Sequence, residues 1–291
     1  MRNKILLVGT ISNVASTIER ELRIIFEALS SFKEIEIFLV ESDSIDNTLE
    51  ILRKLQKKDS RLTFVSKGKL NQLLPNRIER IAYCREVYVE FIKGNHQTKE
   101  WDFVAVADID GMNFKLSKKG IESCFKERLE WDGIMANQKY GYYDIYALRA
   151  DGWVEYDCFA ELKALKKSVA PPKLGSSKII NFVKLFIHYD KLRKRAIYRH
   201  MKILRATDGL IPVTSAFGGF AIYKTEILLT SSYKSNNYHQ SEHVNFHSSN
   251  SSTQRRFFIN PSLINNNFNS YNLNRYGAVR FLREIKKHLK N

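Results

Sequence analysis

Two aspartates one residue apart, Asp108 and Asp110, are the residues of this chain best suited to chemistry. They directly follow the apolar run Asp102–Ala107, which predicts a buried strand. Because alternate residues of an extended chain point to the same side, the two carboxylates can converge. Such oxygen ligands suit Mn²⁺ or Mg²⁺, which can bridge a diphosphate and neutralise a leaving group. An ordinary acidic turn is the alternative, but a place after a parallel strand favours the metal site.

A second polar segment, Glu41–Thr48, follows another apolar run, Ile35–Val40. If both runs are parallel strands, this segment lies at the same sheet edge as Asp108. Its acidic and hydroxyl side chains can accept hydrogen bonds from a ribose or a base amide. A plain turn in which Asp46 caps the next helix is the alternative interpretation.

Arg85 lies within the apolar stripe of a helix predicted for Asn76–Lys93. The stripe repeats at helical spacing and consists of Ile78, Ala82, Val89 and Ile92. A buried guanidinium needs a partner, because an unpaired buried charge is costly. A carboxylate of Asp108 or Asp110 would make this a structural ion pair, and a donor pyrophosphate would make it a ligand contact.

The segment Ser241–His247 combines one glutamate with two histidines. Glu242 suits a general base that takes a proton from an acceptor hydroxyl. His243 or His247 can supply a nitrogen ligand to the same metal ion, although single histidines are more often structural. Upstream, Gly218-Gly219 would let the backbone approach a ligand closely, or would form a bulge.

The elements that must position these residues alternate between strand and helix. Apolar runs predict strands at 4–10, 35–40, 61–65 and 102–107, and amphipathic patterns predict helices at 16–29, 48–57 and 76–93. This alternation predicts an α/β protein whose parallel sheet has helices on both faces. Beyond it we expect adjacent strands at 131–138 and 142–149, a helix at 178–205, strands within 211–223, and a loop through 248–274.

The net charge of +16 is concentrated in two stretches. Residues 161–206 carry 13 Lys or Arg against two acids, and residues 275–291 carry six against one, so the remaining chain is neutral. Basic attachments of this kind face a polyanion or an anionic membrane. In 178–205 apolar residues gather near one face, which suits an anionic membrane interface or packing against the body of the protein. Nucleic acid would not explain Asp108 and Glu242, so we expect none.

Three well-separated cysteines predict reduced thiols rather than a disulfide framework or a zinc site. No apolar run approaches the about 18 to 20 residues that a membrane span needs. Because the first predicted strand begins at Lys4, we expect no signal peptide. The expectation is a cytoplasmic protein, or one peripheral on the cytoplasmic face of the inner membrane.

In combination, these motifs resemble the GT-A glycosyltransferases, and more closely the fungal capsule-associated α-1,3-mannosyltransferases and their bacterial relatives. The resemblance spans most of residues 1–248 outside the basic insertion and rests on the order and spacing of the blocks. The blocks are Glu41–Thr48, Leu74–Ile81 with Arg85, Asp108–Asp110, Tyr143–Arg149, Phe217–Phe220 and Ser241–His243.

The resemblance implies a GT-A fold that uses a nucleotide-sugar donor, UDP- or GDP-linked, and a divalent metal. Asp108 and Asp110 would hold the metal and diphosphate. From its own place in the Ser241–His247 segment, we expect His247 to help to hold the metal. Glu41 and Asp43 would help to hold the nucleotide. Arg85 would contact the donor. The two ligands expected at Glu41–Thr48 and Asp108–Asp110 are therefore the metal and the nucleotide-sugar.

Asp144 and Glu242 would line the acceptor side. In an inverting enzyme Glu242 is the first candidate base and Asp144 the second, whereas a retaining enzyme requires neither. Two departures from the family pattern bear on this. Glu86 follows Arg85 where asparagine is usual, and Glu41-Ser-Asp-Ser44 replaces the commoner Asn-Asp-Gly-Ser, so the stereochemistry is left open.

These inferences predict one GT-A domain over residues 1–274, with a basic helical insertion at about 160–207, and a basic amphipathic helix over 275–291. The expected activity is hexosyl transfer, with mannose as one candidate, to a glycan or lipid-linked glycan in surface polysaccharide or lipopolysaccharide synthesis. A nucleotidyltransferase is an alternative, but the loop Gly9–Asn13 lacks the cation that such enzymes carry after their first strand. A non-catalytic adaptor for membranes or polyanions is the other alternative.

Overall fold

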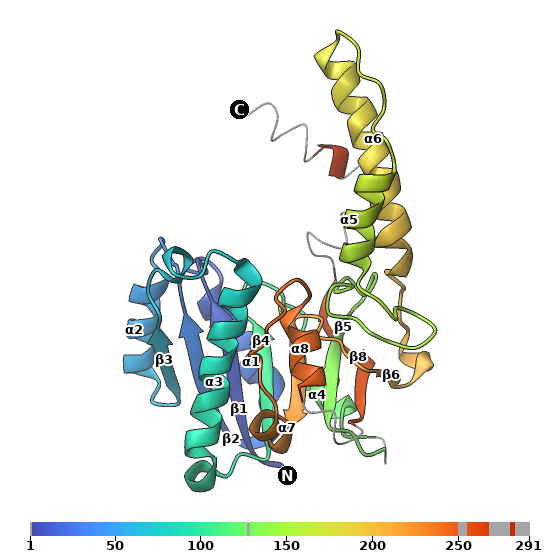
Figure 1. Ribbon diagram of the computed structural model, residues 1–291. Coiled ribbons are helices and arrows are strands. Elements are labelled where there is room, and N and C mark those ends of the chain that lie inside the picture. The colour runs from blue at the N-terminus through green and yellow to red at the C-terminus, as the bar shows by residue number, and fades with distance from the viewer. Residues whose placement is uncertain (1, 127–128, 250–254, 268–279, 283–291) are drawn as a thin grey trace.

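A mixed sheet forms the centre of the protein. The computed structural model describes residues 2–126, 129–249, 255–267 and 280–282. The strands are β1 (Arg2–Ile11), β2 (Phe32–Glu41), β3 (Leu62–Ser66), β4 (Phe103–Asp108), β5 (Gly133–Gln138), β6 (Ile211–Val213), β7 (Phe220–Lys224) and β8 (Phe257–Asn266). Across the described ranges their order in the sheet is β3-β2-β1-β4-β7-β5-β8-β6 (Figure 1).

Most neighbouring strands are parallel, as predicted for an α/β protein. β2 and β4 flank β1 in parallel, β3 is parallel to β2, and β8 is parallel to β5. β7 runs antiparallel between β4 and β5, and β6 is antiparallel to β8. The register pairs Thr10 with Asp108 and Ile11 with Glu41, so the carboxyl ends of three strands meet at one edge.

Helices cover both faces of the sheet. They are α1 (Ile18–Leu29), α2 (Thr48–Lys58), α3 (Arg77–Lys99), α4 (Lys118–Ser123), α5 (Cys158–Ser168), α6 (Lys178–Ala196), α7 (Thr225–Thr230) and α8 (Glu242–Ser248), with short 3₁₀ turns at Leu70–Gln72, Tyr198–His200 and Ala206–Asp208. Figure 1 shows α3, α7 and α8 in front of the sheet. α1 packs against α4 and β2 on the opposite face.

Alternating side chains of β1 divide the core into two apolar clusters. Leu6 and Val8 belong to the cluster that includes residues of α3, and Ile5 and Leu7 belong to the cluster that includes residues of α1. This is the side-chain period of two expected of an extended strand. The fully apolar run in β1 is therefore explained by burial on both faces, as in other parallel sheets.

The segment predicted as a strand at 142–149 is instead a series of turns. Its apolar side chains are buried, but within the described chain its one β contact is the isolated bridge between Arg149 and Ser215. The Asp144 carboxylate accepts a hydrogen bond from the Ala147 backbone N–H at 3.3 Å. Such local side-chain bonds compete with a strand ladder and stabilise a turn.

The segment predicted as a loop at 248–274 contains a ten-residue strand, β8, which pairs with β5 and β6. Pro261 lies inside it, and a proline normally argues against an inner strand. The register of β8 with β5 shifts between the pairs Met135–Ile259 and Asn137–Ile264. Pro261 therefore lies in the irregular stretch, where a bulge removes the need for its missing N–H.

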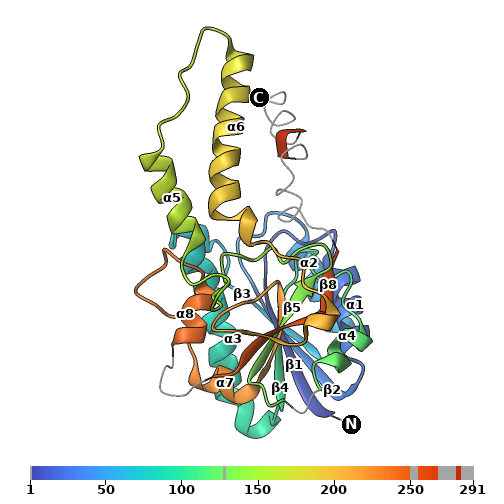
Figure 2. The ribbon, with the colours of Figure 1, turned by 90° about the vertical axis from the view of Figure 1, so that its right-hand side faces the viewer.

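Helices α5 and α6 form a hairpin that projects away from the sheet, as Figures 1 and 2 show. The predicted helix at 178–205 is shorter than expected, because α6 ends at Ala196 and a 3₁₀ turn follows. Of the helix predicted for 275–291, only residues 280–282 are described, and the remainder lies outside the described residues. Within these, Arg280 pairs with Asp190 of α6. Among the described helices, none has the length and apolar character to cross a membrane.

Candidate active site

A pocket of about 830 Å³ opens at the edge where β1, β2 and β4 end. Side chains from the strand-end loops, α3, the 143–146 turn, the first turns of α5 and the start of α8 line it. They include Asp43, Arg77, Arg85, Asp108, Asp110, Asp144, Phe159, Lys163, Glu242 and His243. Five carboxylates thus converge on one space large enough for a nucleotide-sized ligand.

Asp108 and Asp110 both reach this pocket, as their spacing predicted. Asp108 ends β4, where its backbone N–H donates to the Gly219 carbonyl at 2.9 Å. Its carboxylate accepts from the Arg85 guanidinium at 2.8 Å. Asp110 is open to solvent on the pocket side and forms no ion pair within the described part of the chain. The surrounding protein, then the charges of Asp108 and Glu21, raise the pKa of Asp110 to about 7.

Arg85 joins two of the candidate residues. It is 2% exposed, and besides Asp108 it binds Glu242, with 3.1 Å between Nε and Oε1. The guanidinium also lies over the Phe217 ring, 5.0 Å from its centroid. The sequence hypothesis of a carboxylate partner is confirmed for Asp108, whereas the predicted contact with a donor stays a prediction.

Glu21 is a fixed anchor for this site that the sequence analysis missed. The carboxylate is fully buried on α1 and accepts from the backbone N–H groups of Gly111 at 2.6 Å and Asn113 at 2.9 Å. The Asn113 side chain donates to the same carboxylate at 3.0 Å and to the Asp108 carbonyl at 2.7 Å. Glu21 therefore holds the turn that follows Asp110. A signal existed, because Glu21 lies among the buried positions 18, 22 and 25 of α1.

We expect Glu21→Gln to destabilise the protein by about 1–3 kcal/mol, because an amide can supply one acceptor oxygen where the carboxylate supplies two. The amide NH₂ would also face the Gly111 N–H. Urea denaturation measures the change. The matched control is Glu19→Gln on the exposed face of the same helix, which should stay within about 0.5 kcal/mol of wild type. Equal stabilities for the two variants would contradict the anchoring role.

Asp144 lies on the pocket lining beside the double glycine. Its carboxylate accepts from the Gly218 backbone N–H at 3.0 Å and from the Ala147 N–H. Burial, then the charges of Asp108 and Glu242, raise the pKa of Asp144 to about 6. Gly218 has a φ of 71°, and a Cβ there would lie 2.5 Å from the Ala136 carbonyl oxygen. Glycine is therefore required for this close approach.

Glu242 and His243 begin α8 at the pocket wall. Glu242 is 7% exposed and lies on the pocket lining. The His243 ring stacks on Phe217, with 3.8 Å between centroids, and is 2% exposed. Neither ring nitrogen of His243 has a hydrogen-bond partner among the described residues. Burial, followed by the Arg85 charge, holds the pKa of His243 well below its usual range, so the ring is neutral.

His247 does not reach the pocket, so the structure does not support its predicted role as a metal ligand. The ring is buried one helical turn beyond His243, and both its nitrogens are occupied. Ser215 Oγ lies 2.9 Å from Nδ1 and the Tyr223 hydroxyl 2.9 Å from Nε2. The spacing of four residues places both histidines on one helix side, but only the first faces the pocket.

Glu41 lies behind the pocket wall rather than on its lining. The carboxylate is 1% exposed and accepts from Ser66 Oγ and, at 3.0 Å, from the Ser44 N–H. It therefore shapes the loop after β2. Asp43 does line the pocket. Its φ of 61° is in the left-handed region, which aspartate tolerates better than most residues.

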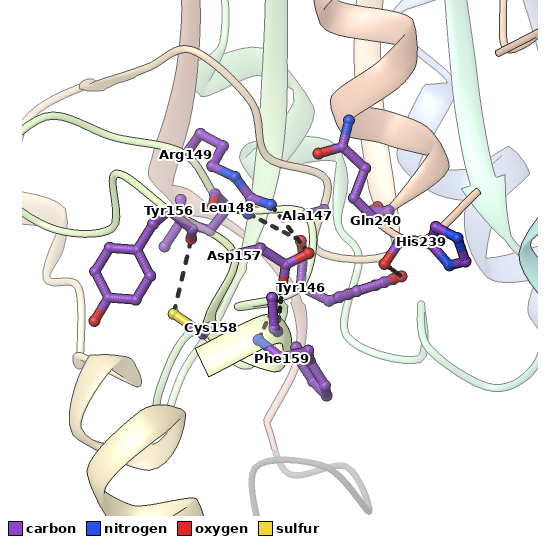
Figure 3. Close-up of polar contacts among 12 residues, drawn as sticks. Tyr146, Ala147, Leu148, Arg149, Tyr156, Asp157, Cys158, Phe159, His239 and Gln240 are labelled. Atoms are coloured by element: carbon purple, nitrogen blue, oxygen red, sulfur yellow. Dashed lines mark hydrogen bonds and ion pairs between the residues drawn. The ribbon is translucent and has the colours of Figure 1, made fainter. Parts of the chain in front are cut away.

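The turn at 143–149 is tied to the base of α5, as Figure 3 shows. Asp157 caps α5 by accepting from the Phe159 N–H at 2.8 Å and lies 3.7 Å from the Arg149 guanidinium. Arg149 also donates to the Leu148 carbonyl at 2.7 Å. The Tyr146 hydroxyl donates to the His239 carbonyl at 3.4 Å. These contacts fix the first turns of α5 against the pocket.

No three Asp, Glu, His or Cys side chains in the described ranges lie close enough together to form a complete metal site. The arrangement that the structure does show is an accessible pair, Asp108 and Asp110, in the same pocket as Asp144 and Glu242. Carboxylates gathered in one pocket can bind a hard cation or accept a proton.

The chain matches one family model. The family described as glycosyl transferase family 2 matches residues 10–169, which is more than half of the chain. Among curated proteins, no sequence matches.

Several solved structures are similar in fold at low sequence identity. S. aureus TarS (residues 1–349) is 13% identical, with a TM-score of 0.42 over 89% of this chain and 58% of that one. The mannosyltransferase PcManGT from Pyrobaculum calidifontis, in complex with GDP-Man and Mn²⁺, is 12% identical, with a TM-score of 0.47 over 100% and 65%. M. tuberculosis glucosyl-3-phosphoglycerate synthase is 12% identical, with a TM-score of 0.35 over 78% and 59%. This chain thus spans less than two thirds of each of these structures.

Proposed function

Because the chain belongs to glycosyl transferase family 2 and has a GT-A fold, we propose that it transfers a hexosyl group from a UDP- or GDP-sugar to a hydroxyl of a glycan or lipid-linked glycan. The observation that carries this proposal is the pocket at the strand ends, which Asp108, Asp110, Asp144 and Glu242 all line. We also propose that residues 1–274 act as one unit in this reaction, with the hairpin as its insertion.

The pocket residues fit a divalent cation. Asp110 is an accessible carboxylate beside Asp108. The surrounding protein, and after it the charges of Asp108 and Glu21, raise its pKa, and a bound cation would favour its ionised form. Asp110 and Asp108 would hold the ion. When bound, the ion would neutralise the charge of the departing nucleoside diphosphate.

For an inverting transfer, Asp144 is the better base of the two candidates. One Glu242 oxygen already binds Arg85, so protonation of Glu242 would weaken a buried ion pair. Asp144 has backbone N–H partners, and its pKa of about 6 leaves it ionised at neutral pH yet able to accept a proton. Asp144 would then take the proton of the attacking hydroxyl, while Glu242 keeps Arg85 and Asp108 in place.

The test is nucleotide release from a panel of UDP-, GDP- and CMP-sugars, GDP-mannose included, with Mn²⁺ or with EDTA. We expect release from one UDP- or GDP-sugar in Mn²⁺ and none in EDTA. In the same assay Asp144→Asn should bind that donor as wild type does but turn it over about 10²-fold more slowly, the size of effect typical for a positioned base. If no donor on the panel binds or is turned over, the proposed function is wrong.

A further inference from the structure

The exposed face of α6 consists only of isoleucine, lysine and arginine. Its exposed residues recur every three or four positions, which is the spacing of one helix side. They include Ile180, Lys184, Ile187, Lys191 and Arg195, with Lys178 and Ile179 at the helix start. Ile179 is 78% exposed, Ile180 56% and Ile187 48%. Isoleucines exposed to this degree, each flanked by cations, form an amphipathic surface.

The other side of α6 is already covered. Phe182 and Phe186 are half-buried, and their rings lie 6.0 and 4.9 Å from the Phe281 ring. The acid of this helix, Asp190, is buried and pairs with Arg280 and Lys194. The described exposed positions of α6 therefore carry no negative charge to offset the cations.

We define the hairpin as residues Cys158–Ala196. Exposed apolar side chains flanked by cations also occur in α5 and in the connection between α5 and α6. Leu174 is 55% exposed and Val169 is 36% exposed in the connection between the two helices. Exposed lysines flank them on both sides, at 163, 166, 167 and 173. Residues 161–206 carry 13 cationic side chains against two acids. An anionic, partly apolar surface would complement both properties.

The hairpin stands on the pocket side of the sheet. In Figures 1 and 2 it extends beyond the edge at which β1, β2 and β4 end, and α6, at 19 residues, is about 28 Å long. Phe159 and Lys163 in the first turns of α5 line the pocket itself. A surface bound along the hairpin would therefore lie beside the pocket opening.

We propose that the hairpin docks on an anionic lipid bilayer, with Ile179, Ile180 and Ile187 entering the interface and the lysines binding lipid phosphates. Basic helices with bulky apolar side chains on the same face bind membrane interfaces in this way. Nucleic acid fits less well, because its backbone offers no apolar partner for exposed isoleucines. We add that the acceptor is a lipid-linked glycan presented at that bilayer, and this addition alone rests on the proposed function.

The test is co-sedimentation of the full chain, without nucleotide or metal, with phosphatidylcholine vesicles and with vesicles containing about one third phosphatidylglycerol. We expect binding to the anionic vesicles, about tenfold weaker binding to the neutral ones, and loss of binding in about 0.5 M NaCl. Lys184→Glu combined with Lys191→Glu should weaken binding to anionic vesicles at least about tenfold. Lys57→Glu with Lys58→Glu, a matched pair of exposed lysines on α2, should leave it unchanged.

A second variant tests insertion separately from charge. Ile179→Ser, Ile180→Ser and Ile187→Ser together should weaken binding about tenfold or more with no change in Tm, since these side chains are exposed. Leu129→Ser, at a residue of similar exposure before β5, is the control. Wild type that fails to bind anionic vesicles, or binding that survives loss of the isoleucines, would overturn the proposal. Donor turnover by the isoleucine variant should equal that of wild type, so failure of vesicle binding and failure of donor turnover remain distinguishable.

Discussion

Asp110→Asn should lower metal-dependent nucleotide release by about 10³-fold, because it removes a carboxylate that would hold the divalent ion. The expected loss is large because the ion stabilises charge that develops only in the transition state. The stability of the metal-free protein should not fall, since Asp110 has no ion-pair partner in the described structure and its charge repels those of Asp108 and Glu21. Steady-state release rates and thermal unfolding with and without Mn²⁺ measure the two effects.

The matched control is Asp151→Asn, which changes an exposed aspartate outside the pocket lining. It should retain the wild-type rate and the wild-type increase in Tm on addition of Mn²⁺. Asp110→Asn should lose that increase, because an ion that binds only the folded protein stabilises it by mass action. An Asp110→Asn variant with full activity would show that the metal site lies elsewhere.

Arg85→Met should destabilise the protein by about 3–5 kcal/mol, the usual cost of removing one partner from a buried ion pair. The reason is that Asp108 and Glu242 would face each other without a countercharge in a part of the protein where Arg85 is 2% exposed. Urea denaturation gives the free energy of unfolding directly. Arg53→Met, on the exposed side of α2, should change it by less than about 0.5 kcal/mol.

Neutralising the carboxylates provides an internal check on this explanation. Adding Glu242→Gln to Arg85→Met should recover part of the lost stability, because one of the two unpaired charges is removed. Glu242→Gln alone, in the presence of Arg85, should be destabilising. If Arg85→Met alone costs less than about 1 kcal/mol, the ion pair is not the element that holds the two sides of the pocket together.

The strand-helix alternation in the first 108 residues was predictable largely because β1, β4 and the second half of β2 are buried on both faces. Such strands appear as continuous apolar runs, and the polar residues that follow them mark one sheet edge. The stripe argument likewise placed Arg85 inside the fold and gave Asp108 as one of its candidate partners, beside Asp110 and a donor pyrophosphate. The same argument applied to α1 would have identified Glu21, which occupies a buried helix position.

Two elements could not be predicted because their stability comes from contacts distant in sequence. β8 contains a proline and several asparagines, and it forms a strand because β5 and β6 supply its partners and a bulge accommodates Pro261. The turns at 143–149 have an apolar pattern that suits a strand. The Asp144 carboxylate stabilises them by binding the N–H of Gly218, 74 residues away.

The roles of the two histidines also depended on tertiary structure. Their spacing puts both on one side of α8, so the sequence could not distinguish a histidine at the pocket from one in the core. The difference comes from Ser215 and Tyr223, which bind both nitrogens of His247. The same limit applies to Glu41, which is the last residue of β2 and whose carboxylate binds Ser66 behind the pocket wall.

The most direct test of the central claim, that Asp108 and Asp110 form a metal-dependent site for a nucleotide-sugar, is calorimetric titration of UDP and GDP into the purified chain. We predict that one of the two nucleotides binds in Mn²⁺, that EDTA abolishes the binding, and that Asp110→Asn abolishes it equally. If neither nucleotide binds in Mn²⁺, or if binding is the same in EDTA, the metal-dependent donor site is contradicted.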